Sequence, residues 1–198
     1  MRELPIQTQD PKRRRVLDAA AGHFLAYGFG RTTMDDIARA ADMSRPAVYI
    51  HFKNKLEIFR ELAAGFGARL VEESKEVLAG DDALESRITR MFDRCFICLK
   101  EELAESPHGA EMLDMKDEIS RELVEECRVM IAAGLADALT REATRNGSDI
   151  GARGFTVETL AAIVLDAFDG AKHRGASVAE LREISSQIGR LASVATGR

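Results

Sequence analysis

One short segment, residues 44–55, combines side chains that bind anions or donate hydrogen bonds with small apolar ones. Its polar or small members are Ser44, Arg45, Pro46, Ala47, Tyr49, His51 and Lys55. Val48 and Phe52 are four residues apart, so on a helix they share a face that can pack against a core. The other residues then point away from that core. A helix with small or hydrogen-bonding residues near its start is suited to the major groove of DNA.

Two short helices joined by a tight turn are expected to position these side chains. Thr33 is a candidate N-cap for the first helix, and Asp36, three residues later, completes a capping-box pattern. The apolar residues of this helix recur at the spacing of one helical face: Met34, Ile37, Ala38 and Ala41. Ser44 can cap the second helix, and Pro46 falls in its first turn, where the missing N–H costs nothing.

A solvated helical hairpin in an all-α protein is the alternative interpretation of this pattern, because short αα-hairpins are common. The spacing of the residues leaves both interpretations open. The sequence on both sides of this segment carries further evidence. Residues 20–59, written AxxxFxxYGFxxTTMDDIARAADMSRPAVYIHFKNKLEIF, resemble the N-terminal domain of the tetracycline-repressor (TetR) family of bacterial transcriptional regulators. The resemblance runs from about Val16 to Leu62.

The resemblance implies a three-helix DNA-binding domain and assigns roles to single residues. Its phosphate-facing positions correspond to Thr33, Tyr49, His51 and Lys55. Its base-facing positions correspond to Arg45, Pro46, Ala47 and Tyr49. Chemically, Arg45 can bind guanine O6 and N7, and Pro46 or Ala47 can touch a thymine methyl group. Lys55 lies near a helix start and suits an anion. A solvated side chain is the alternative for each of these residues.

One residue departs from the family pattern. Family members often have glycine where this chain has Asp42. Aspartate tolerates the left-handed backbone conformation better than most residues, so the turn between the two short helices is expected to survive.

The charge distribution supports a polyanionic partner for the N-terminal part. Residues 1–60 hold 11 Lys and Arg against 7 Asp and Glu, a net charge of +4. Residues 61–198 hold 17 against 26, a net of −9, and the two parts sum to −5. A basic head on an acidic body directs one end towards nucleic acid. Lys12 to Arg15 add a basic run at the start of the first helix, which is either a phosphate contact or an exposed tail.

The remaining pattern predicts an all-α fold with about nine helices. Residues 1–9 are expected to form a flexible arm, residues 10–60 the helix-turn-helix domain, and residues 61–198 a helical ligand-binding and dimerisation domain. Asp10 and Pro11 form a helix start. A long helix is expected from Asn54 to about Ala79. Further helices are expected at about 83–105, 107–115, 117–146, 156–173 and 177–195, with breaks at Ser106-Pro107 and at residues 146–154.

Two residue sets in the C-terminal part are functional candidates. Soft or aromatic apolar residues that could line a small-molecule pocket are Met91, Cys95, Phe96, Leu99, Met112, Met115, Cys127, Met130, Ile131 and Phe168. A filled core is the alternative for them. In the family that this chain resembles, the last two long helices pair with those of a second subunit. The corresponding dimer residues are Leu160, Val164, Ala167, Ala171, Leu181, Ile184, Ile188 and Leu191.

The motifs of several enzyme classes are absent from the sequence. It has no GxxxxGK[ST] phosphate loop, no GxSxG elbow and no HExxH pair, so no catalytic residue is assigned. Cys95 and Cys98 form a CxxC pair in a helical apolar face without further ligands, so no metal or other cofactor is expected. No apolar run approaches the roughly 18 residues that span a bilayer. Reduced cysteines and the lack of a signal-peptide pattern indicate a cytoplasmic protein.

The sequence therefore predicts a TetR-type transcriptional regulator that is not an enzyme. We expect a homodimer that binds a palindromic operator in double-stranded DNA as a repressor and is released by an unknown small-molecule effector, with no membrane partner. The alternatives are a helical protein-interaction module and a ligand-independent regulator without an inducer.

Overall fold

The computed structural model describes residues 8–112 and 121–197, and every regular element within those ranges is a helix. The predicted arm, residues 1–9, lies mostly outside them. In the described ranges no helix is long and apolar enough to cross a membrane. The all-α fold class predicted from the sequence is confirmed.

The chain divides into two compact units. The first contains the described residues of segments 1–69 and 102–125, and the second contains segments 70–101 and 126–197. The helix α4, Lys55–Ala79, contributes to both units, and so does α8, Arg121–Arg145. The predicted boundary after residue 60 falls inside α4.

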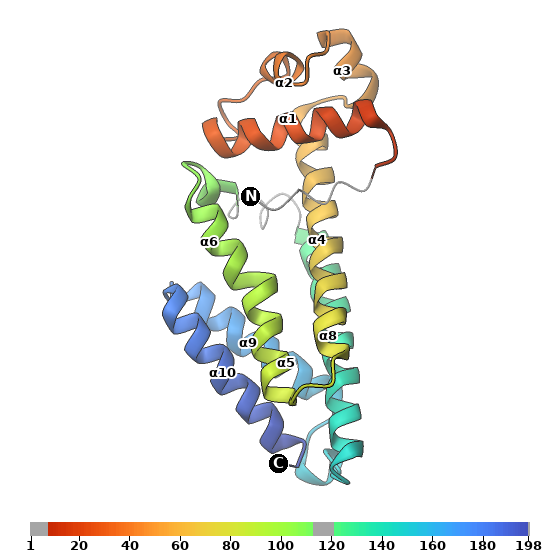
Figure 1. Cartoon of the computed structure of the whole chain (residues 1–198), viewed down its shortest axis with the longest axis vertical. Helices are drawn as coiled ribbons and strands as arrows, with labels where there is room; N and C mark the ends of the chain where they lie inside the picture. Colours follow the sequence, from red (N-terminus) through yellow and green to blue (C-terminus); the bar gives the residue numbers. More distant parts are fainter. Residues whose placement is uncertain (1–7, 113–120, 198) are drawn as a thin grey trace. The chain divides into compact units, whose positions relative to one another are not determined.

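Three helices and the start of α4 form the N-terminal part of the first unit: α1, Pro11–Tyr27, α2, Met34–Ala40, and α3, Arg45–His51 (Figure 1). Local capping explains where they begin. Asp10 accepts a hydrogen bond from the Lys12 N–H with Pro11 in the first turn of α1, and Ser44 accepts one from the Ala47 N–H at the start of α3. These side chains satisfy N–H groups that have no partner within the helix. The caps predicted at Asp10 and Ser44 are confirmed.

The turn after α1 and the turn after α2 each contain a residue with positive φ, Gly28 and Asp42. Gly28 ends α1 at φ +82° and ψ 153°, a positive φ outside the left-handed helical conformation. A Cβ at Gly28 would lie 2.8 Å from a Glu111 carboxylate oxygen. Asp42 has φ +50° in the turn between α2 and α3, as predicted for its place in the family pattern.

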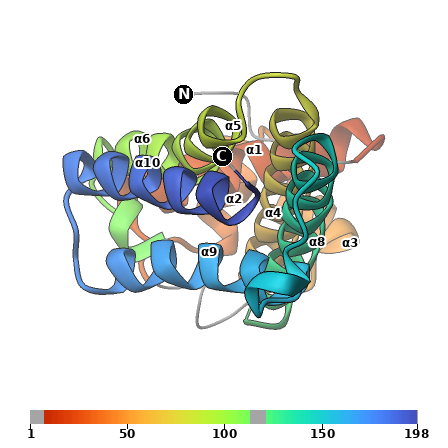
Figure 2. The same ribbon diagram turned by 90° about the horizontal axis from the view of Figure 1, so that it is seen from below.

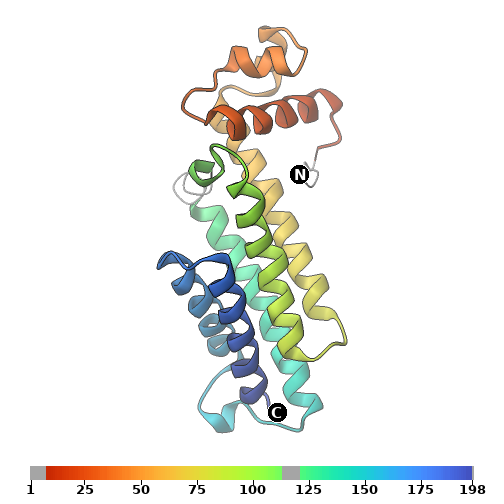
Figure 3. The same cartoon turned by 60° about the vertical axis from the view of Figure 1, so that its left-hand side comes forward.

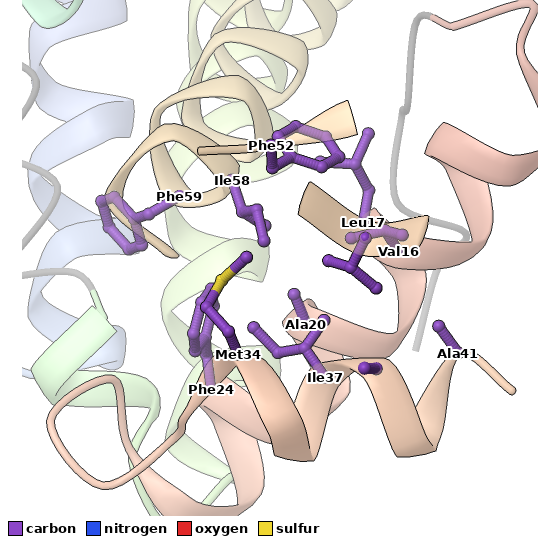
Figure 4. Close-up of a cluster of buried hydrophobic side chains, with 12 residues drawn as sticks. Val16, Leu17, Ala20, Phe24, Met34, Ile37, Ala41, Phe52, Ile58 and Phe59 are labelled. Carbon is purple, nitrogen blue, oxygen red and sulfur yellow. The ribbon is translucent and has the colours of Figure 1, made fainter. Parts of the chain in front are cut away.

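An apolar cluster packs α1, α2, α3 and the start of α4 together. Figure 4 shows side chains from α1, α2, α3 and α4 converging on it. Its buried members are Val16, Leu17, Ala20, Phe24, Met34, Ile37, Ala38, Ala41, Val48, Phe52, Ile58 and Phe59. Tyr27 is exposed, because α1 ends there and the chain turns away at Gly28.

The second unit contains most of the remaining helices. The predicted helix 83–105 is α5, Leu84–Phe92, then a π-helical segment, Asp93–Ile97, and α6, Cys98–Ala104, which follow one another as one rod (Figure 3). A short 3-10 turn, Gly151–Arg153, precedes α9, Val157–His173, and α10, Val178–Ala195. In the predicted helix 107–115, residues 109–112 are helical and residues 113–115 lie outside the described ranges.

Helix α10 packs closely on α5 and also beside α9 (Figure 2). Small residues permit the close approach to α5: a Cβ on Gly189 would lie 2.8 Å from the carbonyl oxygen of Glu85. The rings of Phe92 on α5 and Phe168 on α9 stack with centroids 4.2 Å apart and a 14° interplanar angle. This ring stack ties α5 to α9.

A buried ion pair links α5 to α8 within the second unit. The Arg87 guanidinium donates to the Glu142 carboxylate at 2.8 Å and to the Leu78 carbonyl oxygen at 2.9 Å. Both side chains are almost fully buried. Burial lowers the pKa of Arg87, because a charge removed from water is disfavoured.

Removing the Glu142 carboxylate is expected to destabilise the protein strongly. In Glu142→Ala the Arg87 guanidinium stays buried without its counter-charge, which costs about 3–5 kcal/mol. Urea denaturation followed by circular dichroism measures the change. The matched control is Asp82→Ala, which breaks the exposed pair with Arg90 and should cost less than about 1 kcal/mol. Equal losses in the two variants would contradict the assignment of a structural role to the buried pair.

Candidate nucleic-acid interface

The orientation of α3 follows from two residues on one of its faces. Val48 and Phe52 are buried in the apolar cluster of the first unit, as predicted. Arg45, Pro46, Tyr49 and Ile50 are exposed. They occupy the i, i+1, i+4 and i+5 positions of the helix and therefore lie together on its solvent side. We call these four residues the exposed face of α3.

Arg45 is engaged on this face. Its Nε and Nη1 atoms lie 3.1 and 3.2 Å from the two carboxylate oxygens of Asp35 on α2. The guanidinium also lies over the Tyr49 ring, 5.5 Å from its centroid. The side chains of Tyr49 and Asp35 together raise the pKa of Arg45. The side chain remains 60% exposed, but a guanine contact would have to replace the two-point contact with Asp35.

Thr33 forms the predicted capping box. Its hydroxyl oxygen accepts from the Asp36 N–H at 3.2 Å, and the Asp36 carboxylate accepts from the Thr33 N–H at 3.0 Å. The Thr33 hydroxyl also donates to that carboxylate at 2.6 Å. These hydrogen bonds hold the pKa of Asp36 below its usual value. Thr33 is exposed, but its one hydroxyl hydrogen is donated to Asp36, so a phosphate contact through this hydroxyl would have to replace that hydrogen bond.

His51 and Lys55 are both turned inwards to a large extent. The His51 side chain is 15% exposed, and its Nδ1 atom lies 3.3 Å from a carboxylate oxygen of Asp10. Lys55 donates to three carbonyl oxygens between α1 and α2, those of Phe29, Gly30 and Thr32, at 2.6, 3.2 and 2.9 Å. An ammonium group has three hydrogens to donate. In this structure the Lys55 side chain therefore holds the turn after α1 and does not project from the exposed face of α3.

Two arginines of the basic run at the start of α1 bind groups of other helices and turns. Arg13 binds the Glu61 carboxylate and the His51 carbonyl oxygen, and its guanidinium lies 4.2 Å from the centroid of the Phe52 ring. Arg15 donates to the carbonyl oxygens of Ala41 and Asp42. Neither predicted alternative, a phosphate contact or an exposed tail, describes these two residues. They connect α1 to α3, α4 and the turn at Asp42.

The predicted pocket residues lie in different surroundings. Met91, Cys95, Cys127, Ile131 and Phe168 are buried. Phe96 and Leu99 are half-buried, Met130 is exposed, and Met115 lies outside the described residues. Met112 packs against the apolar cluster of the first unit. Phe96 and Phe168 have ring centroids 5.7 Å apart, next to the stack of Phe92 on Phe168. Five of the ten thus have the placement expected of a filled core.

An open groove lies elsewhere in the second unit, between α5 and α10. Its volume is about 540 Å³, and the residues that line it are polar or charged types: Glu85, Ser86, Thr89, Arg90, Asp93, Arg182, Ser185 and Ser186. None of these residues was in the predicted pocket set. Arg182 crosses one end and binds Asp93 at 2.9 Å and Glu101 at 2.7 Å. In the described ranges, no group of three or more His, Cys, Asp or Glu side chains is arranged to hold a metal ion.

The predicted dimer residues divide by burial within the single chain. Leu160, Val164, Ala171, Leu181 and Ile188 are buried between helices of their own subunit. The most apolar face of α9 and α10 is thus used within the subunit, and the dimer role of these five residues stays a prediction. Ala167 and Leu191 are exposed and Ile184 is half-buried. Further exposed apolar side chains on the same two helices are Ile163 and Val194.

Sequence reasoning missed Ile50. The side chain is 81% exposed, at the end of the exposed face of α3. The sequence does indicate that Ile50 is exposed. It lies four residues after Pro46 and two after the buried Val48, and on a helix this spacing places it away from the core.

The site and fold define an all-helical protein with a helix-turn-helix near its N-terminus. Residues 16–62 match the family model described as bacterial regulatory proteins, tetR family. The regulator SrpR of Pseudomonas putida is 46% identical over 52 residues, 26% of this chain and 24% of SrpR. AcrR of Shigella flexneri is 38% identical over 56 residues, 28% of this chain and 26% of AcrR. These alignments span about a quarter of the length of the curated relatives.

Solved structures match over most of the chain. A TetR-family regulator from Mesorhizobium loti has a TM-score of 0.65 at 19% identity, with 92% of this chain and 95% of that one covered. SmeT, the repressor of a multidrug efflux pump of Stenotrophomonas maltophilia, has a TM-score of 0.63 at 23% identity, with 97% and 90% covered. Identities at this level establish the fold. The match to the TetR family model covers residues 16–62, about a quarter of the chain.

Lys55→Ala is expected to reduce stability, because it removes three hydrogen bonds from a charged donor to the turn after α1. The expected loss is about 1–3 kcal/mol in the free energy of unfolding. Lys53→Ala removes an exposed lysine two residues away and should change stability by less than about 0.5 kcal/mol. Thermal and urea denaturation of both variants measure the difference. A Lys55→Ala protein of unchanged stability that binds DNA more weakly would instead restore the predicted phosphate contact.

Proposed function

We propose that this protein is a DNA-binding transcriptional regulator of the TetR type that acts as a homodimeric repressor. Its operator is palindromic, and a small molecule bound by the C-terminal part releases it. The observation that carries the DNA-binding step is the exposed face of α3, held in place by Val48 and Phe52 within the segment that matches the family. The named relatives are regulators and none is an enzyme, which supports the prediction that this chain is not one.

Binding by α3 follows from the chemistry of its exposed face. Arg45 and Tyr49 offer donors, and Pro46 and Ile50 offer apolar surface within less than two turns of helix. A helix of this kind fits the major groove, where each base pair has its own pattern of donors, acceptors and methyl groups. The interaction-module alternative is not favoured, because the matched segment is shared with named transcriptional regulators. A regulator of this kind would act in the cytoplasm.

Dimerisation through α9 and α10 would supply two such helices at a fixed spacing. Ile184, Leu191 and Val194 lie at i, i+7 and i+10 on one side of α10, and Ile163 and Ala167 lie four apart on α9. Leu191 is 69% exposed in the single chain. Burying these apolar side chains against a second copy supports a dimer, and two-fold symmetry matches a palindromic site.

The effector step rests on the family fold and on one structural relative. A complex of SmeT with triclosan has a TM-score of 0.60 to this chain at 22% identity, with 94% of this chain and 90% of that one covered. We infer a small-molecule effector for this chain as well. It would act by favouring a state in which the two α3 helices no longer match the operator, and affinity would fall by the difference in effector binding between the two states.

Arg45→Ala should abolish a specific gel shift on DNA from upstream of the protein's own gene while leaving the fold intact. The change removes a cation from the exposed face of α3 and leaves Asp35 unpaired beside the phosphates, so we expect at least about a tenfold loss of affinity at moderate salt. Arg174→Ala makes the same charge change at an exposed turn after α9 and is the control. Equal affinity of the Arg45→Ala variant and the wild type would argue against the proposal.

Leu191→Asp should convert the dimer to a monomer, because a carboxylate would be buried in the proposed interface without a partner. Light scattering after size-exclusion chromatography measures the mass in solution. Val129→Asp introduces the same charge at an exposed aliphatic position of α8 and should leave the mass unchanged. A wild-type protein that is monomeric at micromolar concentration would remove this part of the proposal.

A further inference from the structure

Ile50 is the most exposed large apolar side chain among the described residues, at 81%. It contributes no packing to the first unit, since Val48 and Phe52 bury the opposite face of the same helix. A β-branched side chain at this position gains neither helix propensity nor burial. An apolar side chain held out of the core in this way is available to contact a partner.

The surroundings of Ile50 favour a partner that is both anionic and locally apolar. Pro46 precedes it by four residues and is also exposed, so the two form an apolar strip along the helix. Lys53 is exposed nearby in sequence, and so are Arg45 and Arg39, which pair with carboxylates of α2. Residues 1–60 carry a net charge of +4. DNA fits this combination, because the thymine methyl group is the apolar feature of an otherwise polar major groove flanked by phosphates.

Arg45 is less available for reading bases than its position implies. Asp35 holds its guanidinium at two points, and the Tyr49 ring lies beside it. A guanine would have to compete with a carboxylate that already offers the same two-point geometry. The apolar strip has no such competitor on the exposed face of α3.

We propose that Ile50 is a specificity-determining residue that contacts the 5-methyl group of a thymine in each operator half-site. The inference rests on the proposed function and adds the chemical class of base that α3 reads. Arg45 then acts as a positioning residue that orients Tyr49, and Pro46 covers the neighbouring part of the groove. The operator is expected to contain at least one thymine per half-site whose methyl group matters.

The test uses the full-length protein and an operator fragment identified by footprinting. Each thymine in a half-site is replaced in turn by deoxyuridine, which lacks only the 5-methyl group, and affinity is measured by fluorescence anisotropy. At one position the wild type should lose about fourfold in affinity, the value for one methyl group removed from water. Ile50→Ala should bind the unmodified operator more weakly and should no longer respond to that replacement.

A methyl group on a different base gives an independent readout. Replacing the critical thymine–adenine pair by cytosine–guanine should weaken wild-type binding, and 5-methylcytosine at that position should recover part of the loss. Ile50→Ala should show no such recovery. Val129→Ala, at an exposed aliphatic position of α8, should keep the wild-type response to every replacement.

The outcomes separate this inference from the proposed function. If the wild type prefers one DNA sequence but no deoxyuridine replacement affects binding, the inference is overturned and the proposed function stands. The same holds if Ile50→Ala keeps the full wild-type response to methyl removal. If the wild type shows no sequence preference at moderate salt, the proposed function and the inference fail together.

Discussion

The burial of one face of a seven-residue helix is the constraint on which the candidate interface depends. Val48 and Phe52 reach a cluster made by α1, α2 and α4, and this contact leaves α3 only one orientation. A helix of fewer than two turns has little stability of its own, so tertiary packing must fix it. Loss of either contact would free the exposed face to rotate, and the side chains on it would no longer converge on one groove.

Much of the positive charge in the first unit serves the fold and is not displayed. Arg13, Arg15 and Lys55 donate to carbonyl oxygens of residues 23 to 38 positions away, at the end of a helix or in a turn. Backbone carbonyls at such places have no helical partner, and a long cationic side chain can supply one. Net charge therefore shows the general tendency of a segment to meet polyanions, but overstates the number of cations free to do so.

Local features were predictable from the sequence, and long-range partners were not. The caps at Asp10, Thr33 and Ser44 depend on residues within three positions, so a short pattern was sufficient to find them. The partner of Arg45 lies ten residues away on another helix, and the order of residues does not reveal it. The same limit applies to the predicted dimer residues. Apolar periodicity marks a buried face but does not distinguish burial in the subunit from burial by a partner.

The small size of the exposed face explains why a regulator of this design would need two copies of it. Four side chains on α3 can contact only a few base pairs, and each correct contact discriminates by about 1–3 kcal/mol. The many competing sites of a genome require more than one such helix supplies. A second subunit adds the same contacts again without a new recognition surface. A fixed spacing between the two copies then contributes to specificity, and a ligand that alters this spacing would act on both half-sites at once.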